Sequence, residues 1–318
     1  MRLPEPLLAH GPGGALAGSL WLPDGAARAL VLMHPGSGPS DRDNDVFFPP
    51  IRAALLAVGA AVASYDKRGV GESEGSWLTA SVTDQADDVV AGLGAARSAL
   101  AGAGVTPGRH RSGDGLPTVL FGHSQGGWVV LEAAARAEAA GVVTSSGPAV
   151  TPGEQERFST ATTVRRAGWP DHDAAEALAA FDGLMSLAER GAGYGELRAW
   201  SEDRARRDLL ERLAALGAFV PTSREIWRLA TLLVGHDPAE ALRRLDVPLL
   251  AVFGADDGVV PVERSVAVLR ETVRPGLLDV AVLPGGDHRL EGSDDAFVPG
   301  YPDVVVEFVE RVASGASR

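Results

Sequence analysis

A serine between glycines is the residue of this chain best suited to chemistry. Ser124 lies in the pentapeptide G-H-S-Q-G at 122–126, which follows the apolar run T-V-L-F and leads into W-V-V-L. This order predicts a strand, a sharp turn and a helix, with the serine hydroxyl projecting from the turn. The helix would direct free N–H groups and the positive end of its dipole toward the same spot. The pattern is typical of a nucleophilic serine.

A serine hydroxyl is a weak nucleophile at neutral pH, so it needs a base that a carboxylate orients. Two later segments supply both groups. F-G-A-D-D-G-V-V-P at 253–261 places Asp256 and Asp257 just beyond an apolar run, and L-P-G-G-D-H at 283–288 places His288 beyond the next run. Open α/β sheets build active sites from such residues at the carboxyl ends of parallel strands.

Short apolar runs that end in turn-forming residues divide most of the chain. Such runs are typical of parallel strands, which are buried on both faces, and helical patterns lie between them. We therefore predict an α/β fold with a mostly parallel central sheet and helices on both faces, preceded by an N-terminal hairpin. The runs are 29–33, 61–65, 118–121, 141–144, 248–253 and 278–282, and the helical patterns are 48–57, 81–100, 127–138, 262–270 and 301–312.

One region interrupts this alternation, because it contains helical patterns but no convincing strand. We predict that it forms an inserted all-helical cap over 148–244, between two core segments at 1–147 and 245–318. Its helical patterns are 173–188, 197–216 and 224–233.

Half of the six tryptophans of the chain fall within this predicted cap. Trp169, Trp200 and Trp227 are therefore candidates for substrate contact, because a cap over the edge of the sheet would turn part of its apolar surface toward the substrate. Packing within the cap's own core is the alternative, which we favour for any single one of them.

Four motifs in this order resemble those of the serine hydrolases in the α/β-hydrolase superfamily that carry a helical cap. The motifs are 36–43, 66–73, 122–126 and 254–261 followed by His288, and the resemblance covers nearly the whole chain outside the cap. In this family the acid usually lies in a G-x-x-D-x-x-V-P pattern. The resemblance therefore selects Asp257, with Asp256 as the alternative, and it implies that His123 points away from the nucleophile and is structural.

The loop H-P-G-S-G-P-S-D-R-D at 34–43 resembles the H-G-S-G loop that supplies an oxyanion donor in this family, although a proline follows the histidine here. The resemblance implies an oxyanion hole made by the backbone N–H groups of Ser37 and Gln125. Loss of one such donor typically lowers the rate by about 100- to 1000-fold. His34 is a further candidate for substrate contact, with packing as the alternative.

The segment D-K-R-G-V-G-E-S at 66–73 resembles the D-x-R-G-x-G-x-S turn of the same family. Its glycines could suggest a nucleotide-binding loop, but the phosphate-binding lysine and serine pattern is not met. We interpret it as a structural turn with a local Asp–Arg pair. The histidines and carboxylates show no convincing metal-ligand spacing, so we expect neither a metal nor a cofactor.

The composition limits the classes of partner. A formal net charge of −13 argues against a nucleic-acid surface, and no apolar run approaches the roughly 18 residues of a membrane span. The N-terminal residues do not resemble a secretory signal, and the chain has no cysteine, so we expect a cytoplasmic protein without disulfides. Lys67 is the only lysine.

These features together predict two-step acyl transfer, in which Ser124 attacks an ester-like carbonyl of a small molecule and His288 acts as the base. A serine nucleophile disfavours dehalogenase and epoxide-hydrolase chemistry, for which the family uses aspartate. The electrophile stays open among carboxylic ester, lactone, thioester and amide. Three other functions also stay open: an aminopeptidase with a cap carboxylate for the substrate amine, a biosynthetic acyltransferase or cyclase, and a non-catalytic ligand receptor on the same fold.

Overall fold

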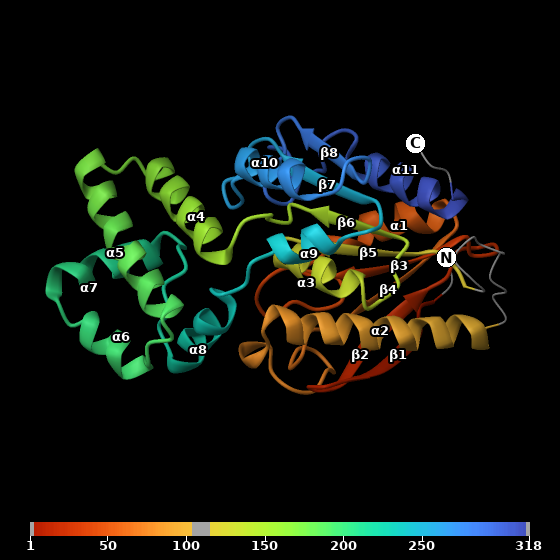
Figure 1. The fold of residues 1–318 in the computed structure, drawn as a ribbon, viewed down its shortest axis with the longest axis horizontal. Coiled ribbons are helices and arrows are strands. Elements are labelled where there is room, and N and C mark those ends of the chain that lie inside the picture. Colours follow the sequence, from red (N-terminus) through yellow and green to blue (C-terminus); the bar gives the residue numbers. More distant parts are fainter. Residues whose placement is uncertain (1–2, 104–114, 316–318) are drawn as a thin grey trace.

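The computed structural model describes residues 3–103 and 115–315, and an eight-stranded sheet lies at the centre of these residues (Figure 1). Its strand order is β1-β2-β4-β3-β5-β6-β7-β8. β2 is antiparallel to both of its neighbours, and the strands from β4 to β8 in this order are parallel. The strands are β1 Glu5–Gly11, β2 Gly14–Trp21, β3 Ala29–His34, β4 Ala60–Tyr65, β5 Thr118–His123, β6 Gly141–Ser145, β7 Leu249–Gly254 and β8 Leu278–Leu283.

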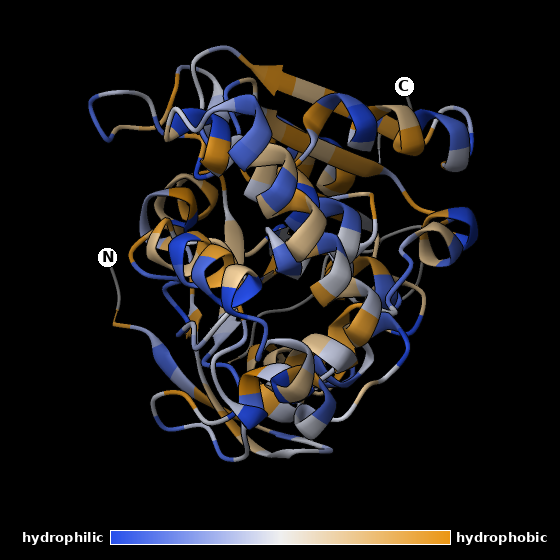
Figure 2. Ribbon diagram, turned by 90° about the vertical axis from the view of Figure 1, so that its left-hand side faces the viewer, coloured by the Kyte–Doolittle hydropathy of each residue, from blue (hydrophilic) through white to orange (hydrophobic). Residues whose placement is uncertain are grey.

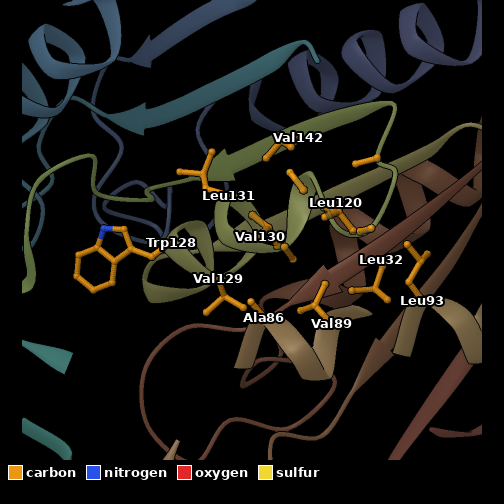
Figure 3. Close-up of a cluster of buried hydrophobic side chains, with 14 of the residues drawn as sticks. Leu32, Ala86, Val89, Leu93, Leu120, Trp128, Val129, Val130, Leu131 and Val142 are labelled. Atoms are coloured by element: carbon orange, nitrogen blue, oxygen red, sulfur yellow. The ribbon is translucent and has the colours of Figure 1, made fainter. Parts of the chain in front are cut away.

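The apolar runs form strands because helices cover both faces of the sheet. Along β3, Leu30 and Leu32 pack into one hydrophobic core, while the alternate residues Val31 and Met33 pack into the other. The first core also contains side chains of α2 Val82–Gly102, α3 Gln125–Ala134, α9 Ala239–Arg244 and α10 Val262–Thr272. The second contains side chains of α1 Phe48–Ala57 and α11 Tyr301–Ser314. Figure 3 shows part of the first core, where Leu32 and Leu120 of the sheet lie beside Val89 of α2. The predicted α/β class is confirmed.

A helical insertion, α4 to α9, separates β6 from β7, and its first five helices form a group at one end of the sheet (Figure 1). We call this group the lid; its helices are α4 Pro152–Arg166, α5 Asp171–Glu189, α6 Tyr194–Trp200, α7 Arg204–Ala215 and α8 Arg224–Leu233. The lid has a hydrophobic core of its own, with Phe181 and Leu213 fully buried. Hydrophobic and hydrophilic residues alternate along its helices in Figure 2, in which the lid faces the viewer.

The last helix of the insertion differs from the others. Ala241 and Leu242 of α9 are buried in the first core of the sheet, and α9 packs against α3 and α10. The cap that we predict over 148–244 therefore includes one helix that belongs to the layer beside the sheet.

The lid differs from the sequence prediction in two places. The pattern over 197–216 predicts one helix, but the structure has α6 and α7, separated at 201–203. The break follows from Asp203, whose side chain accepts a hydrogen bond from the Arg206 N–H and so begins a new helix. α4 has no counterpart among the predicted patterns, although Thr151 caps it and a proline occupies its first turn. None of the helices in the described ranges is long and apolar enough to cross a membrane.

Candidate active site

Ser124 occupies a sharp turn between β5 and α3. Its backbone has φ 53° and ψ −124°, a region that residues with a side chain rarely adopt. The turn requires glycine at both flanking positions, because neither position has room for a side chain. A Cβ on Gly122 would overlap the carbonyl of Gly126, and a Cβ on Gly126 would lie 2.6 Å from the carbonyl oxygen of His34. Ser124 is partly accessible to solvent at the start of the helix.

Three polar side chains meet at this turn although they are far apart in the sequence. His288 Nε2 lies 2.9 Å from Ser124 Oγ, and His288 Nδ1 lies 2.9 Å from Asp257 Oδ2. A carboxylate can only accept, so His288 Nδ1–H is the donor to Asp257 and Nε2 is free to accept the serine proton. The arrangement has the hydrogen-bonded order that nucleophilic catalysis by serine requires.

Asp257 is held from both sides. Its Oδ1 accepts backbone N–H groups from Val259 at 2.7 Å and Val260 at 2.9 Å, and its side chain has no exposed surface. The neighbouring Asp256 is exposed at the surface, and its backbone carbonyl accepts a hydrogen bond from Arg166 of the lid. Of the two aspartates, Asp257 is the one that contacts His288.

A second hydrogen-bonded chain connects the loop after β3 to the loop that carries His288. The Gly36 N–H donates to Asn44 Oδ1 at 3.3 Å, which sets the amide orientation, and Asn44 Nδ2 donates to His123 Nδ1 at 3.0 Å. His123 Nε2 then donates to the His288 carbonyl at 3.4 Å. Burial, followed by the proximity of His288, holds the pKa of His123 well below its usual value, so the ring is neutral.

No motif of the sequence singles out Asn44. Its φ is 47°, and the next two residues, Asp45 and Val46, also have positive φ. Asparagine tolerates this conformation better than most residues, but the signal is weak without a structure. His123, for which the family resemblance implies a structural role, has both ring nitrogens hydrogen-bonded, to Asn44 and to the His288 carbonyl.

The candidate oxyanion donors line the same cavity as Ser124. Ser37 and Gln125 both line the cavity that contains Ser124 and His288. Gln125 is the first residue of α3, so its N–H has no acceptor within the helix. Lys67 also lines this cavity, and its Nζ donates to the Gly36 carbonyl at 2.8 Å and to Gln125 Oε1 at 3.1 Å.

The cavity has a volume of about 380 Å³ and lies between the lid and the carboxyl edge of the sheet. Its walls are mainly apolar, and one lid carboxylate, Glu156 of α4, faces the space. Among the described residues that line it, Glu156 is the one acid. Burial raises the pKa of Glu156 to about 7. The main apolar side chains are Trp128 of α3, Met185 of α5, Phe219, and Ile226, Leu229 and Leu233 of α8.

The aromatic candidates from the sequence lie elsewhere. Trp227 is buried in the lid core, where its Nε1–H donates to the Ala192 carbonyl. Trp169 and Trp200 stack against arginine guanidinium groups of the lid, at 3.9 and 4.3 Å from the ring centres. The structure therefore places all three in packing positions, and it brings Trp77 and Trp128 to the cavity instead.

His34 is buried, and it is not among the residues that line the cavity with Ser124. Burial, and next the proximity of the Lys67 ammonium, lowers the pKa of His34 to about 3. Its position in the structure is therefore a packing position with a neutral ring.

The predicted local Asp–Arg pair in the turn at 66–73 is not formed. Asp66 accepts two hydrogen bonds from the Arg42 side chain, and Arg68 pairs with Asp88 of α2. Both partners are distant in sequence, so the turn is attached to the loop after β3 on one side and to α2 on the other.

Comparisons with known proteins give one family and many similar folds. A family model described as Serine aminopeptidase, S33, matches residues 25–295. No curated protein matches the chain. Among solved structures, a thermophilic esterase from Thermogutta terrifontis with malate bound is 20% identical with a TM-score of 0.56, covering 98% of this chain and 100% of that chain.

Two further solved structures have similar folds. A lipase in its open form is 19% identical with a TM-score of 0.60, covering 98% of this chain and 99% of that chain. Proline iminopeptidase from Mycobacterium smegmatis is 17% identical with a TM-score of 0.57, covering 98% of this chain and 99% of that chain. At such identities the likeness shows a shared fold, and substrate has to be argued from the site.

Proposed function

The chain belongs to the hydrolase family described as Serine aminopeptidase, S33, and we propose that it cleaves a carboxylic ester through an acyl-enzyme on Ser124. The observation that carries the proposal is the hydrogen-bonded chain from Ser124 Oγ through His288 to Asp257, which opens on an apolar cavity. The cytoplasmic location expected from the sequence is part of the same proposal.

The proposed reaction has two steps. His288 Nε2 takes the Ser124 proton as Oγ attacks the ester carbonyl, and the resulting imidazolium is stabilised by the Asp257 carboxylate. The N–H groups of Ser37 and Gln125 stabilise the oxyanion, and the alcohol leaves after it accepts the proton from His288. Water then attacks the acyl-enzyme with the same base, and the acid is released.

The cavity walls favour an apolar acyl group. Leu229 and Leu233 of α8 and Met185 of α5 line the space beside the nucleophile. Burial of each CH₂ group of an acyl chain there contributes about 0.8 kcal/mol. A short or medium aliphatic ester therefore fits the site better than a charged substrate.

The Ser124→Ala variant tests this proposal. A series of p-nitrophenyl esters of increasing acyl length is expected to give turnover with the wild type, and kcat/KM is expected to rise with chain length until the cavity is full. Ser124→Ala is expected to lower kcat by about 10⁴-fold or more, because the remaining groups cannot form an acyl-enzyme. A fluorophosphonate probe should label the wild type and not the variant.

Mass analysis of the products separates hydrolysis from acyl transfer or cyclisation by the same residues. A wild type that turns over no ester, thioester or lactone and forms no fluorophosphonate adduct would contradict hydrolysis and favour a ligand receptor.

Glu156 supports a second candidate function, an aminopeptidase. An α-ammonium group would need a carboxylate partner within the cavity, and Glu156 is the acid that lines it among the described residues. Two other residues of the same helix, Gly153 and Gln155, also line the cavity, so α4 presents this face to the substrate. The family description and the similarity to a proline iminopeptidase agree with this alternative.

Glu156→Gln distinguishes the two candidate functions. For an aminopeptidase, KM for an aminoacyl p-nitroanilide is expected to rise by about 10- to 100-fold in the variant, because a charged hydrogen bond is lost. The raised pKa of Glu156, about 7, means that the carboxylate forms as the pH rises through 7. The wild-type KM for the amine substrate should therefore fall from pH 6 to pH 7.5.

N-acetylated substrates and simple esters are the controls, and they should show neither effect if Glu156 binds an ammonium group. Equal rates for free and acetylated anilides, or no cleavage of either, would contradict the aminopeptidase function.

A further inference from the structure

Lys67 is a buried cation in the wall of the cavity. It is the only lysine of the chain, and it is 6% exposed. Burial lowers the pKa of Lys67 to about 7, so the protein holds this ammonium at a cost in stability. Its side-chain hydrogen bonds go to two neutral acceptors, the Gly36 carbonyl and the Gln125 side-chain carbonyl. Strongly perturbed groups of this kind often lie at functional sites.

The first acceptor belongs to the same peptide unit as one oxyanion donor. The carbonyl of Gly36 and the N–H of Ser37 form a single planar, resonance-coupled group. A cation that donates to this carbonyl withdraws electron density from the unit, which strengthens the N–H as a donor. The hydrogen bond, 2.8 Å long, also fixes the plane of the peptide and hence the direction of the Ser37 N–H.

The second acceptor belongs to the residue that carries the other donor. Lys67 Nζ lies 3.1 Å from Gln125 Oε1, and the Gln125 backbone N–H begins α3 beside Ser124. A single ammonium therefore donates to the carbonyl of the peptide that carries the Ser37 N–H and to the side chain of Gln125.

The backbone holds Lys67 in this position independently of its side chain. The Lys67 N–H donates to the Ser40 carbonyl at 3.2 Å, and the adjacent Asp66 carboxylate accepts the Arg42 N–H at 2.9 Å. The turn after β4 is thus attached at two points to the loop that carries Ser37. The ammonium approaches the loop on a rigid support, as preorganised electrostatic stabilisation requires.

We propose that Lys67 is a positioning residue of the oxyanion hole, which holds and polarises the 36–37 peptide and fixes Gln125 beside the nucleophile. This inference rests on the proposed esterase function. In its protonated form, which predominates below about pH 7, Lys67 also contributes positive charge to a cavity of low dielectric, where a developing oxyanion is stabilised more than in water. The effect belongs to the transition state, since the ester carbonyl carries no full charge before attack.

Lys67→Met tests this inference, because methionine keeps the length of the side chain and removes its charge and hydrogen bonds. The kcat for the best p-nitrophenyl ester is expected to fall by about 10- to 100-fold, less than the loss of a whole donor, while KM changes by less than about threefold. Affinity for an alkyl boronic acid, which forms a tetrahedral adduct on the serine, should fall by a similar factor.

Arg97→Met is the matched control, since Arg97 is a half-buried cation that donates to the backbone carbonyl of Ala137, away from the cavity. Its kcat should stay within about twofold of the wild type. A folded Lys67→Met protein with unchanged kcat would overturn the inference, whether or not its KM is raised.

A measurement on the wild type keeps the inference testable if Lys67→Met does not fold. Labelling with ¹⁵Nζ-lysine gives one side-chain resonance, because the chain has one lysine. This resonance is expected to shift when the boronic acid forms its adduct and to stay unchanged when the acid is added to Ser124→Ala. An adduct without a shift overturns the role of Lys67 alone, whereas a wild type that forms no adduct overturns the esterase function and this inference with it.

Discussion

Replacement of Asp257 by asparagine is expected to lower kcat by about 10³- to 10⁴-fold without loss of the fold. The reason is the proton arrangement around this side chain. Oδ1 accepts two backbone N–H groups, and Oδ2 accepts His288 Nδ1–H. Asparagine has one acceptor oxygen, which the two backbone N–H groups will take, so its NH₂ group must face His288.

An NH₂ group at that position requires His288 to present Nδ1 as an acceptor. The ring then carries its proton on Nε2, which lies 2.9 Å from Ser124 Oγ and can no longer accept the serine proton. The base is present but in the wrong tautomer. Measurement of kcat with the best ester, together with the fluorophosphonate labelling rate, tests this expectation.

Asp256→Asn is the matched control. The Asp256 side chain is exposed, so its loss should change kcat by less than about threefold. The opposite result, with Asp256→Asn inactive and Asp257→Asn active, would show that the acid assignment is wrong.

Replacement of Gly122 by alanine is expected to destabilise the protein by about 2–4 kcal/mol and to lower kcat by about 100-fold or more. The added methyl group would overlap the Gly126 carbonyl, and it would also lie 2.7 Å from Val130 Cγ2 of α3. These atoms belong to the backbone and core of the turn, so relief of the overlap requires α3 to move away from β5. That movement displaces Ser124 from His288.

Gly94→Ala in α2 separates this effect from a general effect of alanine. Gly94 is exposed within the helix, and a Cβ there would meet no atom within 4 Å. Alanine should therefore raise the free energy of unfolding by about 0.5–1 kcal/mol. Chemical denaturation of both variants measures the two free energies; a Gly122→Ala protein as stable and active as the wild type would contradict the steric argument.

Much of the fold could be predicted because its signals are local. The run at 118–121 and the glycines on both sides of Ser124 indicate a strand, a turn and a helix within a few residues, and the structure has β5 and α3 there. The helix predicted at 224–233 has the same bounds as α8, because Ser223 caps its first turn. The single helix predicted over 197–216 was wrong, because the periodicity of its apolar residues outweighed the capping signal of Asp203.

The site was predictable only where a residue ends a strand. Asp257 and His288 follow β7 and β8, and the carboxyl ends of parallel strands meet at one edge of the sheet. Asn44, Lys67 and Glu156 gave no such signal. Their contacts depend on which atoms face them from distant segments, and sequence spacing does not contain that information.

The sequence alone determined the α/β class, the strand, turn and helix around Ser124 and the order of the acid and base candidates, because each depends on short patterns of size, polarity and turn chemistry. The tertiary structure decided which aspartate reaches His288 and which aromatic side chains line the cavity. It also decided that the one lysine of the chain contacts the Gly36 carbonyl, next to Ser37, and the Gln125 side chain. These are contacts between segments far apart in the chain, and only the packing of the lid and loops against the sheet brings them within hydrogen-bond distance.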